Sequence, residues 1–428
     1  MYEFHPYITN DGSVGLYSPD FNDIYHSATG ALTEAYEKFI LPVDIDKLLQ
    51  KDSIRVLDIC YGIGYNSKSF LNLIFEKFFE KNSTMQKRSI AQIYTNNIKT
   101  QPFKSDQVSS TSIEEIHGDN ILPSISIHAV DNDKILTFLS PFIKTGIKNT
   151  KNKNIDFDYE KIYKYLNTKS NKKLPKIINE INFLIFDQIC QNSPEILEND
   201  EIREILNNPK YASYFDSKIR GIYELYKTKA SKSKGKQGFF TFLHNIYYQY
   251  VSDGYKKTLK RYLKQDINFA LKNMDARDFI KSSTNLYDLI FLDAFTPSKC
   301  PCLWSYEFFK QLFEHLESDG ILLTYSTSAS VRAAMIEAGF SIGYIFNEKE
   351  KKYMGTFAAK NPQKIIYPLS EFDSGLLKTT AGIFYRDKNL TALNEAIIEQ
   401  RKNEVNFSNR MSTSKFKKLF SRRKNGEI

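Results

Sequence analysis

The feature that most constrains the fold is an apolar run that ends in a carboxylate. Residues 286–292 are apolar or aromatic apart from Asp288, and Asp293 follows them directly. A short run of this kind, bounded by turn residues, is typical of a buried strand in a parallel sheet. Because open α/β sheets bind ligands beyond the carboxyl ends of their strands, Asp293 is predicted to face a ligand site. The alternative is that Asp293 caps the loop or the next helix.

A strand, a glycine loop and a helix are predicted in succession at residues 54–60, 61–67 and 69–79. This order is typical of a nucleotide-type site, since glycines let the backbone approach a ligand and the first turn of a helix offers free N–H groups. The predicted cofactor contacts in this loop are Gly62, Gly64 and Asn66.

The loop departs from the dinucleotide fingerprint, because Ser67 stands where the third glycine is expected. Asp58, at the end of the strand before the loop, would repel the diphosphate of a dinucleotide. The same carboxylate suits a cationic ligand, and S-adenosylmethionine carries both a sulfonium and an ammonium group. S-adenosylmethionine is therefore the predicted cofactor, and a dehydrogenase is disfavoured.

Two further acids follow predicted strands. Asp131 comes near the end of a strand that begins at Ile125, and Asp275 follows the strand at residues 267–272. An acid after the second strand of such a sheet accepts hydrogen bonds from ribose hydroxyls, a role predicted for Asp131 with Asp133 as the alternative. Asp275 is placed to bind an adenine amino group, or else to cap the helix that follows it.

The chain is predicted to divide into a core with two insertions, a lead-in and a tail. The lead-in consists of loops and turns followed by a helix at residues 31–40, and it either covers a ligand site or packs on the surface. The core continues after Asp293 with alternating helices and strands and a turn at residues 318–320. The expected segments are a lead-in at 1–50, a core at 51–140 and 265–375, a polar insertion at 81–117, a largely helical insertion at 141–264 and a basic tail at 376–428.

The charge of the chain favours an anionic partner. The formal net charge is +9, and residues 401–428 carry nine Lys or Arg against two Glu. Residues 81–110, with five Lys or Arg and one Asp, are similarly biased. These are the places where phosphate contacts are expected, although a solvated basic surface would give the same numbers.

The cysteines and the hydropathy pattern exclude several classes. Four cysteines in 428 residues do not make a disulfide scaffold, and the C-P-C spacing at residues 300–302 fits neither a redox nor a zinc pair, so no metal is predicted. No apolar run reaches membrane-spanning length, and the first residues lack the layout of a signal peptide. The protein is expected to be soluble and cytoplasmic, with no membrane partner.

Four acids at successive strand ends, at positions 58, 131, 275 and 293, indicate a class I methyltransferase fold, an α/β fold with a mostly parallel seven-stranded sheet. Residues 293–304, DAFTPSKCPCLW, resemble the D-[GA]-F-x-P-x-K-N-P-x-[ML]-W signature of the MnmC-like methyltransferase family. Cys300 stands where that family usually has Asn, and the loop YGIGY departs from the more usual FGTGL.

Other segments are similar to the same family. They are residues 18–27 with Gly30 and Glu34, residues 325–332 with 338–340, residues 352–356, and residues 385–387 with Leu390 and Arg401. The resemblance covers about residues 15–80, 125–140 and 265–405, and leaves both insertions outside.

The resemblance implies methyl transfer from S-adenosylmethionine to the exocyclic amine of 5-aminomethyl-(2-thio)uridine at the tRNA wobble position. The implied partners are the anticodon region of tRNA and the upstream enzymes that supply the aminomethyl precursor. No second glycine fingerprint follows residue 345, so the fused flavin oxidase of the bifunctional relatives is not expected. The sequence does not indicate an oligomeric state.

Asp293 is the candidate catalytic residue, because a carboxylate near an ammonium group can orient it and take its proton. Pro297 and Pro301 would stiffen the loop, and Phe295 or Trp304 could stack on the base, although Trp304 fits a core position equally well. Lys299 is expected at an RNA phosphate or in closing the loop. Arg332 and the basic tail are weaker phosphate candidates.

Two other functions fit the same pattern. A spermidine synthase-like aminopropyltransferase shares the fold and sets an aspartate against an amine, but it lacks the motifs above. A catalytically inactive RNA-binding protein could keep a methyltransferase fold. Binding of S-adenosylmethionine, or a preference for its decarboxylated form, would separate the three.

Overall fold

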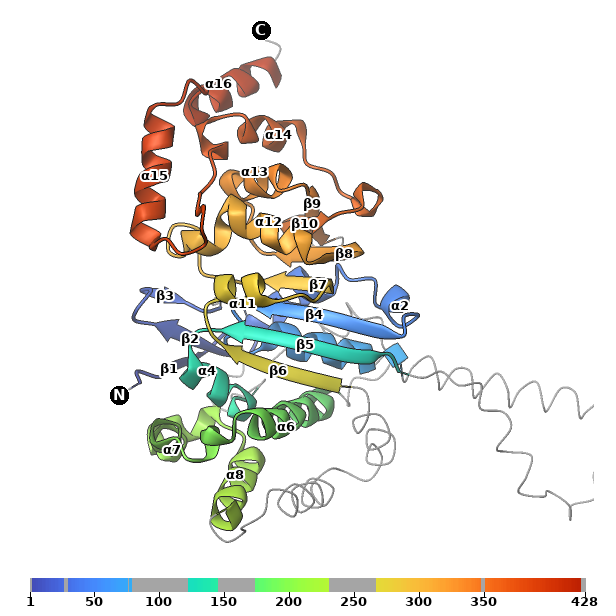
Figure 1. The fold of residues 1–428 in the computed structure, drawn as a ribbon, viewed down its shortest axis with the longest axis vertical. Helices are drawn as coiled ribbons and strands as arrows, with labels where there is room; N and C mark the ends of the chain where they lie inside the picture. The colour runs from blue at the N-terminus through green and yellow to red at the C-terminus, as the bar shows by residue number, and fades with distance from the viewer. Residues whose placement is uncertain are drawn as a thin grey trace, which may run out of the picture.

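A computed structural model of the protein describes residues 2–26, 30–75, 77–78, 122–144, 174–230, 267–347 and 351–424. Its centre is a seven-stranded sheet with the strand order β6-β5-β4-β7-β8-β10-β9 (Figure 1). The strands are β4 (Ser53–Ile59), β5 (Ser124–Asp131), β6 (Ile267–Asn273), β7 (Tyr287–Leu292), β8 (Leu316–Thr324), β9 (Ser341–Asn347) and β10 (Lys352–Ala359).

The sheet is mostly parallel. Strands β6, β5, β4, β7 and β8 pair in parallel, and β10 runs antiparallel to both of its neighbours, β8 and β9. The carboxyl ends of β4, β5, β6 and β7 therefore meet at one edge of the sheet. The predicted class I methyltransferase fold is confirmed. Asp58 and Asp131 lie in the last two positions of β4 and β5, and Asp275 and Asp293 follow β6 and β7 within two residues.

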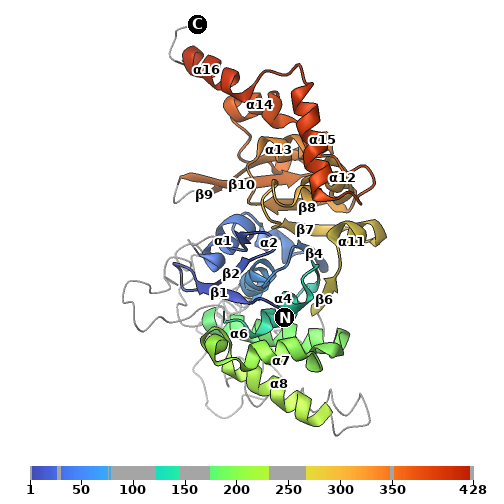
Figure 2. The ribbon, with the colours of Figure 1, turned by 90° about the vertical axis from the view of Figure 1, so that its left-hand side faces the viewer.

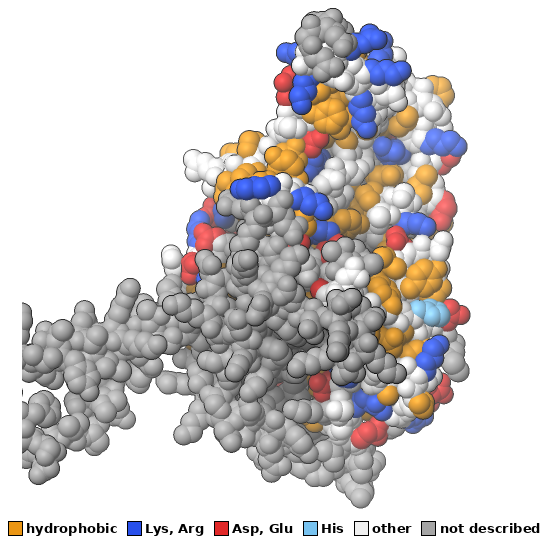
Figure 3. All heavy atoms as spheres, turned by 180° about the vertical axis from the view of Figure 1, so that it is seen from behind, with side chains coloured by type: hydrophobic (Ala, Val, Ile, Leu, Met, Phe, Trp, Pro, Cys, Tyr) orange, Lys and Arg blue, Asp and Glu red, His pale blue; other side chains and the backbone are white. Residues whose placement is uncertain are grey.

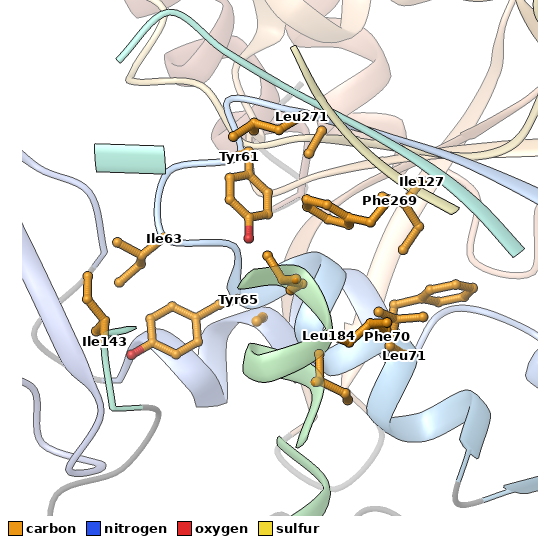
Figure 4. Close-up of a cluster of buried hydrophobic side chains, with 14 of the residues drawn as sticks. Tyr61, Ile63, Tyr65, Phe70, Leu71, Ile127, Ile143, Leu184, Phe269 and Leu271 are labelled. Atoms are coloured by element: carbon orange, nitrogen blue, oxygen red, sulfur yellow. The ribbon is translucent and has the colours of Figure 1, made fainter. Parts of the chain in front are cut away.

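Each face of the sheet is covered by its own core, because side chains alternate between the faces along a strand. Ile290 and Leu292 of β7 pack under α11 (Ala276–Ser282), α12 (Tyr306–Glu314) and α13 (Ala329–Glu337). Leu289 and Phe291 point to the other face, where helical residues 65–75 and α6 (Leu174–Asn192) lie. Figure 4 shows this second core, with Phe70 and Leu71 beside Leu184 of α6 and Phe269 of β6.

The lead-in forms a small sheet before its helix. The prediction of loops and turns in this segment is therefore wrong. Strands β1 (His5–Ile8), β2 (Val14–Ser18) and β3 (Asp23–Ile24) pair antiparallel. The Tyr65 hydroxyl fixes β2, since it lies 3.0 Å from both the N and the O of Val14. These strands are stabilised by packing on the core, which their short polar sequence does not reveal.

The helix predicted at residues 31–40 is present in two parts, α1 (Ala31–Ala35) and the π-helical η1 (Tyr36–Ile40). A short helix, α2 (Ile45–Leu48), leads into β4. The first part of the predicted helical insertion is helical where it is described. Its elements are η4 (Ser140–Phe142), α6, η5 (Pro194–Leu197), α7 (Asp200–Asn207), η6 (Pro209–Tyr214) and α8 (Ser217–Ala230). The polar insertion at 81–117 and the basic aromatic stretch at 239–264 lie outside the described residues.

The turn predicted at residues 318–320 is wrong, because these residues belong to β8. A Cβ added at Gly320 would lie 2.8 Å from the carbonyl oxygen of Tyr287 in the neighbouring strand. The glycine thus permits a close approach of two strands at an irregularity in their register, and it does not reverse the chain. The predicted hairpin after residue 340 is formed by β9 and β10.

The C-terminal segment forms a helical cap on the side of the sheet that contains β8, β10 and β9 (Figures 1 and 2). It contains η8 (Pro362–Lys364), α14 (Glu371–Leu377), η9 (Thr380–Gly382), α15 (Asn394–Asn406) and α16 (Thr413–Lys424). Among all the residues that are described, no helix has both the length and the apolarity needed to cross a membrane.

Candidate active site

A cavity of about 410 Å³ opens at the carboxyl ends of β4, β5, β6 and β7. This volume lies within the range typical of small-molecule sites. Its wall includes residues of the lead-in, of the loops after all four strands, and of the C-terminal segment. Those used below are Phe21, Tyr25, Glu34, Cys60, Asp131, Met274, Asp275, Arg277, Asp293, Phe295, Ala392, Leu393 and Asn394.

Asp293 lies directly after β7 and lines this cavity. Its backbone N–H donates to the carbonyl oxygen of Ile59 at 3.2 Å, and its Oδ2 accepts a hydrogen bond from Asn66 Nδ2 at 3.0 Å. Desolvation by the surrounding protein, followed by the charge of Glu34, raises the pKa of Asp293 to about 7. A carboxyl group with this pKa can accept a proton near neutral pH.

The glycine loop after β4 has the left-handed backbone that glycine favours, with φ of 54° at Gly62 and 80° at Gly64. A Cβ on Gly64 would come within 2.3 Å of the Tyr61 ring, so this position has no room for a side chain. Cys60, with φ of 62°, is the loop residue that lines the cavity. Gly62, Gly64 and Asn66 stand behind this wall, and Asn66 reaches the site through its bond to Asp293.

Asp131 ends β5 and lines the cavity, while Asp133 does not. Asp131 Oδ2 accepts a hydrogen bond from the Gly62 N–H at 2.8 Å, which ties the strand end to the glycine loop. Burial raises the pKa of Asp131 to about 6. Asp133 caps α4 (Lys134–Leu139) through the Leu136 N–H, so it serves the fold.

Asp58 is fully buried on the face of the sheet that carries helical residues 65–75, and it does not line the cavity. Its Oδ2 accepts hydrogen bonds from the hydroxyl and the N–H of Ser67, at 2.6 and 3.2 Å. Its other oxygen, Oδ1, is buried with no hydrogen-bond partner among the described residues. Burial raises the pKa of Asp58 to about 8. The structure therefore places Asp58 behind the cavity wall, where it holds the first turn of the helix that follows the glycine loop.

Asp275 both lines the cavity and caps α11, so the two predicted roles coincide in one residue. Its carboxylate accepts hydrogen bonds from the Arg277 side chain, including one from Nη2 at 2.8 Å. Burial alone would raise the pKa of Asp275, but the hydrogen bonds from Arg277 outweigh it and the pKa is lowered. Asp275 therefore keeps its negative charge at neutral pH.

Arg277 connects this acid to the C-terminal segment. Its Nη1 donates to Asp387 Oδ2 at 2.8 Å and to the carbonyl oxygen of Ala392 at 2.9 Å. Ala392 and its neighbours Leu393 and Asn394 form part of the cavity wall. Sequence reasoning missed Arg277 and Asp387, and the only available signal was the Tyr385–Asp387 segment of the family resemblance.

The loop after Asp293 contributes one aromatic ring to the cavity. Phe295 lines it and stacks on Phe21 with ring centroids 4.3 Å apart, while Tyr25 approaches the same ring at 4.9 Å. Trp304 lies in the core with no exposed surface, and its indole N–H donates to the carbonyl oxygen of Phe295 at 2.8 Å. Trp304 is thus a core residue that holds the loop, as the alternative prediction stated. It cannot stack on a base.

The remaining candidates, two in the loop after β7 and one in α13, lie outside the cavity wall. Pro297 is partly buried, and Lys299 is exposed to solvent on the outside of the loop. Arg332 is buried and is bound to Asp373 Oδ2 at 2.8 Å and to the hydroxyl of Thr356 at 2.9 Å. The suggestion that Arg332 contacts a phosphate is therefore wrong.

The charge of the wall fits S-adenosylmethionine. Among the described residues that line the cavity, Arg277 is the only basic one, and it is already bound to two carboxylates. The acids are Asp23, Glu34, Asp131, Asp275 and Asp293. A cation entering the cavity would stabilise the charged form of the buried carboxyls and lower their pKa values. The acidic residues of the cavity wall thus favour a positively charged ligand.

Comparisons with known proteins agree with this chemistry. Residues 238–360 match a family model described as S-adenosyl-L-methionine-dependent methyltransferase. An uncharacterised protein of Methanocaldococcus jannaschii is 34% identical over 131 residues, which cover 30% of this chain and 36% of that protein. The tRNA 5-methylaminomethyl-2-thiouridine biosynthesis bifunctional protein MnmC of Burkholderia vietnamiensis is 36% identical over 67 residues, which cover 16% of this chain and 10% of that protein.

The matched stretches thus span about a third or less of the length of these curated relatives. The crystal structure of MNMC2 from Aquifex aeolicus has the same fold, with a TM-score of 0.50 and 19% identity over 95% of this chain and 86% of that one. Fold, family model and relatives agree with the motifs around Asp293. The predicted resemblance to MnmC-like, S-adenosyl-L-methionine-dependent methyltransferases is therefore confirmed.

Proposed function

We propose that this protein methylates the exocyclic amine of 5-aminomethyl-(2-thio)uridine at the wobble position of tRNA. The observation that carries the proposal is the position of Asp293, a carboxyl with a pKa of about 7 that faces an acidic cavity beside the glycine loop. The relatives from Burkholderia carry a tRNA 5-methylaminomethyl-2-thiouridine name, which supplies the substrate class. The proposed setting is the cytoplasm, where other tRNA-modifying enzymes would provide the aminomethyl precursor.

The cofactor would lie along the ends of β4, β5 and β6. Asp131 and Asp275 line the cavity there, so Asp131 would accept hydrogen bonds from ribose hydroxyls and Asp275 from an amino group of the adenine. Met274 offers an apolar surface beside Asp275 for the flat face of the base. When bound, S-adenosylmethionine supplies an electrophilic methyl group.

The acceptor amine is protonated at neutral pH, and only its neutral form has a lone pair. Asp293, once ionised, would hold the ammonium group and take one proton from it. Asn66 would keep the carboxylate in place, because it lies in the first turn of the helix that follows the glycine loop. Alignment of the amine with the methyl group would supply much of the remaining rate.

Aromatic side chains at the cavity would hold the base that carries the amine. Phe21 comes from the lead-in and Phe295 from the loop after β7, and their rings are stacked. A pyrimidine placed against such a surface gains stacking energy on the order of 1–3 kcal/mol. The lead-in thus takes part in the proposed substrate site.

An aminopropyl transfer is the second candidate, because the acidic wall also suits a polyamine. The two differ in the cofactor they use. Isothermal titration should show binding of S-adenosylmethionine in preference to its decarboxylated form, and the reverse preference would favour aminopropyl transfer. Absence of binding by either compound would favour an RNA-binding protein without activity.

The decisive experiment is nucleoside mass spectrometry of tRNA from a deletion strain. The expected result is accumulation of the aminomethyl nucleoside and loss of its methylated form. Complementation with the natural sequence should restore the methylated nucleoside, and complementation with Asp293→Ala should not. Unchanged nucleosides in the deletion strain would contradict the proposal.

A further inference from the structure

Helix α16 (Thr413–Lys424) carries positive charge with almost no compensation. All six of its basic residues are exposed, and the helix has no acidic residue. Among the described residues, only Arg423 of the six has an acid within 4 Å, the exposed Glu371. The six are Lys415, Lys417, Lys418, Arg422, Arg423 and Lys424. Like charges three and four positions apart destabilise an isolated helix, so binding of an anionic partner would stabilise α16.

Despite its charge, α16 is fixed on the rest of the protein. Phe416 and Phe420 pack against Phe372 of α14, with ring centroids 5.8 and 5.1 Å apart. Gly375 makes room for this contact, because a Cβ there would come within 2.3 Å of the Phe416 ring. The basic residues are thereby held on the outer side of the helix, and Figure 3 shows Lys and Arg side chains gathered at that end of the molecule.

The position of α16 relative to the cavity is set by α15. Asn394, the first residue of α15, lines the cavity, and Phe407 follows the last residue of the helix. A helix of 13 residues is about 20 Å long, so the far end of α15 lies about that distance from the cavity wall. Figure 1 shows α15 leading from the level of the strand ends to α16.

The junction between the two helices adds an exposed aromatic ring to this surface. Phe407 is 86% exposed, and Arg410 beside it is exposed as well. Cations around an exposed aromatic ring are the combination with which proteins bind single-stranded RNA, through phosphate contacts and base stacking. An acidic membrane is a poorer fit, since the rings of Phe416 and Phe420 are already used against Phe372.

We propose that α16, with Phe407 and Arg410, binds the phosphate backbone of an RNA whose reactive nucleotide lies in the cavity. This rests on the proposed function for the identity of the RNA, but not for the contact itself. The two sites on one chain would together select an extended RNA, because a free nucleoside reaches only the cavity.

The test compares two charge-matched variants. In one, Lys415, Lys417 and Lys418 are changed to Gln; in the other, the exposed Lys210, Lys310 and Lys352, on other elements, are changed to Gln. Each protein is titrated with an unmodified tRNA transcript at several salt concentrations. The α16 variant should bind at least about tenfold more weakly at physiological salt. The salt slope, which is the slope of log K against log[salt], should decrease in magnitude by about 2. The matched variant should stay close to the natural protein.

A third variant, Phe407→Ala, should weaken binding about fivefold or more without changing the salt slope, because stacking releases no counterions. Equal affinities for all proteins, or an equal loss in both charge variants, would overturn the proposal. So would stronger α16-dependent binding to phosphatidylserine vesicles than to the transcript. None of these titrations requires methyl transfer, so a different modified nucleoside would refute the proposed function and leave this result intact.

Discussion

Asn66 Nδ2 lies 3.0 Å from Asp293 Oδ2, so an amide in the first turn of the helix after the glycine loop holds an acid 227 residues further along the chain. The contact joins the ends of β4 and β7, which are neighbours in the sheet. It places the side chain that would meet the amine directly beside the loop that would meet the cofactor. The two halves of the proposed reaction are thus connected by one hydrogen bond.

Replacement of Asp293 by Ala is expected to lower turnover by at least about 100-fold, since a positioned acid–base group contributes 10²–10⁴. The dissociation constant for S-adenosylmethionine, measured by isothermal titration, should change little. Asp278→Ala is the matched control, because this acid of α11 is 59% exposed and forms an ion pair with Lys281 at the surface. Undiminished turnover by the Asp293 variant would refute its role.

The pH dependence of turnover should change when Asn66 is replaced by Ala. In the natural protein the rate should rise with pH through an apparent pKa near 7, as Asp293 loses its proton. The Asn66 amide stabilises the charged carboxylate, so its removal raises the pKa of Asp293 and moves the rise to higher pH. The measurement is a pH–rate profile at subsaturating substrates, which reports the pKa values of the free enzyme.

The acceptor amine also titrates, but it does so equally in both enzymes, so the difference between their profiles reports on Asp293. Asn361→Ala is a suitable control, since Asn361 caps η8 and its amide contacts Asp319. Superimposable profiles for the Asn66 variant and the natural protein would show that Asp293 does not set the rate.

Thermal stability without cofactor should fall as the pH rises from about 4 to 7. Burial raises the pKa values of Asp131, Asp293 and Asp58 to about 6, 7 and 8. At these three carboxyls the folded protein binds more protons than the unfolded chain, whose carboxyls titrate near 4. Burial lowers the pKa values of His26 and Lys68 to about 4 and 7, which acts in the opposite direction. Three carboxyls outweigh these two groups below pH 7, so the free energy of unfolding decreases with pH up to that point. Differential scanning calorimetry at several pH values measures this trend.

Saturating S-adenosylmethionine should flatten this dependence, because a cation in the cavity lowers the pKa of the acids that face it. The Asp58→Asn variant separates the buried acid from those of the cavity, since Asp58 does not line the wall. Its stability should fall less steeply with pH than that of the natural protein, and its response to the cofactor should be kept. A melting temperature that rises with pH in the natural protein would contradict the assignment.

Much of the core could be predicted because its signals are local. The apolar run before Asp293 and the glycines after β4 each mark a strand end within a few residues, and the parallel order then gathers those ends at one edge. The lead-in was predicted less well. Strand β2 is stabilised by Tyr65, a contact across 51 residues that no local pattern encodes.

Side-chain direction was the other limit. Asp58 was expected to line the site, but a shift of one position along a strand changes the face of the sheet, and its side chain points to Ser67. Trp304 was a candidate for stacking, yet its indole is turned into the core to hold Phe295. A sequence motif identifies such residues, but it does not show in which direction the side chain points or which atom it contacts.

The last prediction concerns Arg277, which joins Asp275 on the cavity wall to the C-terminal segment. The Asp387 side chain is 1% exposed, so Arg277→Ala leaves a buried carboxylate without its guanidinium partner. The expected loss in the free energy of unfolding is about 3 kcal/mol or more. Because Arg277 also holds Asp275 and the carbonyl of Ala392, the KM for S-adenosylmethionine should rise about tenfold or more, with a smaller change in kcat.

Arg203→Ala serves as the control, since Arg203 and Asp200 form a pair at the surface, with side chains 43% and 72% exposed, and such pairs contribute at most about 1 kcal/mol. Urea unfolding and steady-state kinetics on both variants measure the two effects separately. Asp387→Asn keeps the size of the side chain and removes its charge, so it should reproduce the rise in KM with a smaller loss of stability. If Arg277→Ala were destabilised with an unchanged KM for the cofactor, Arg277 would be a structural residue only, and Asp275 would not need it to form the site.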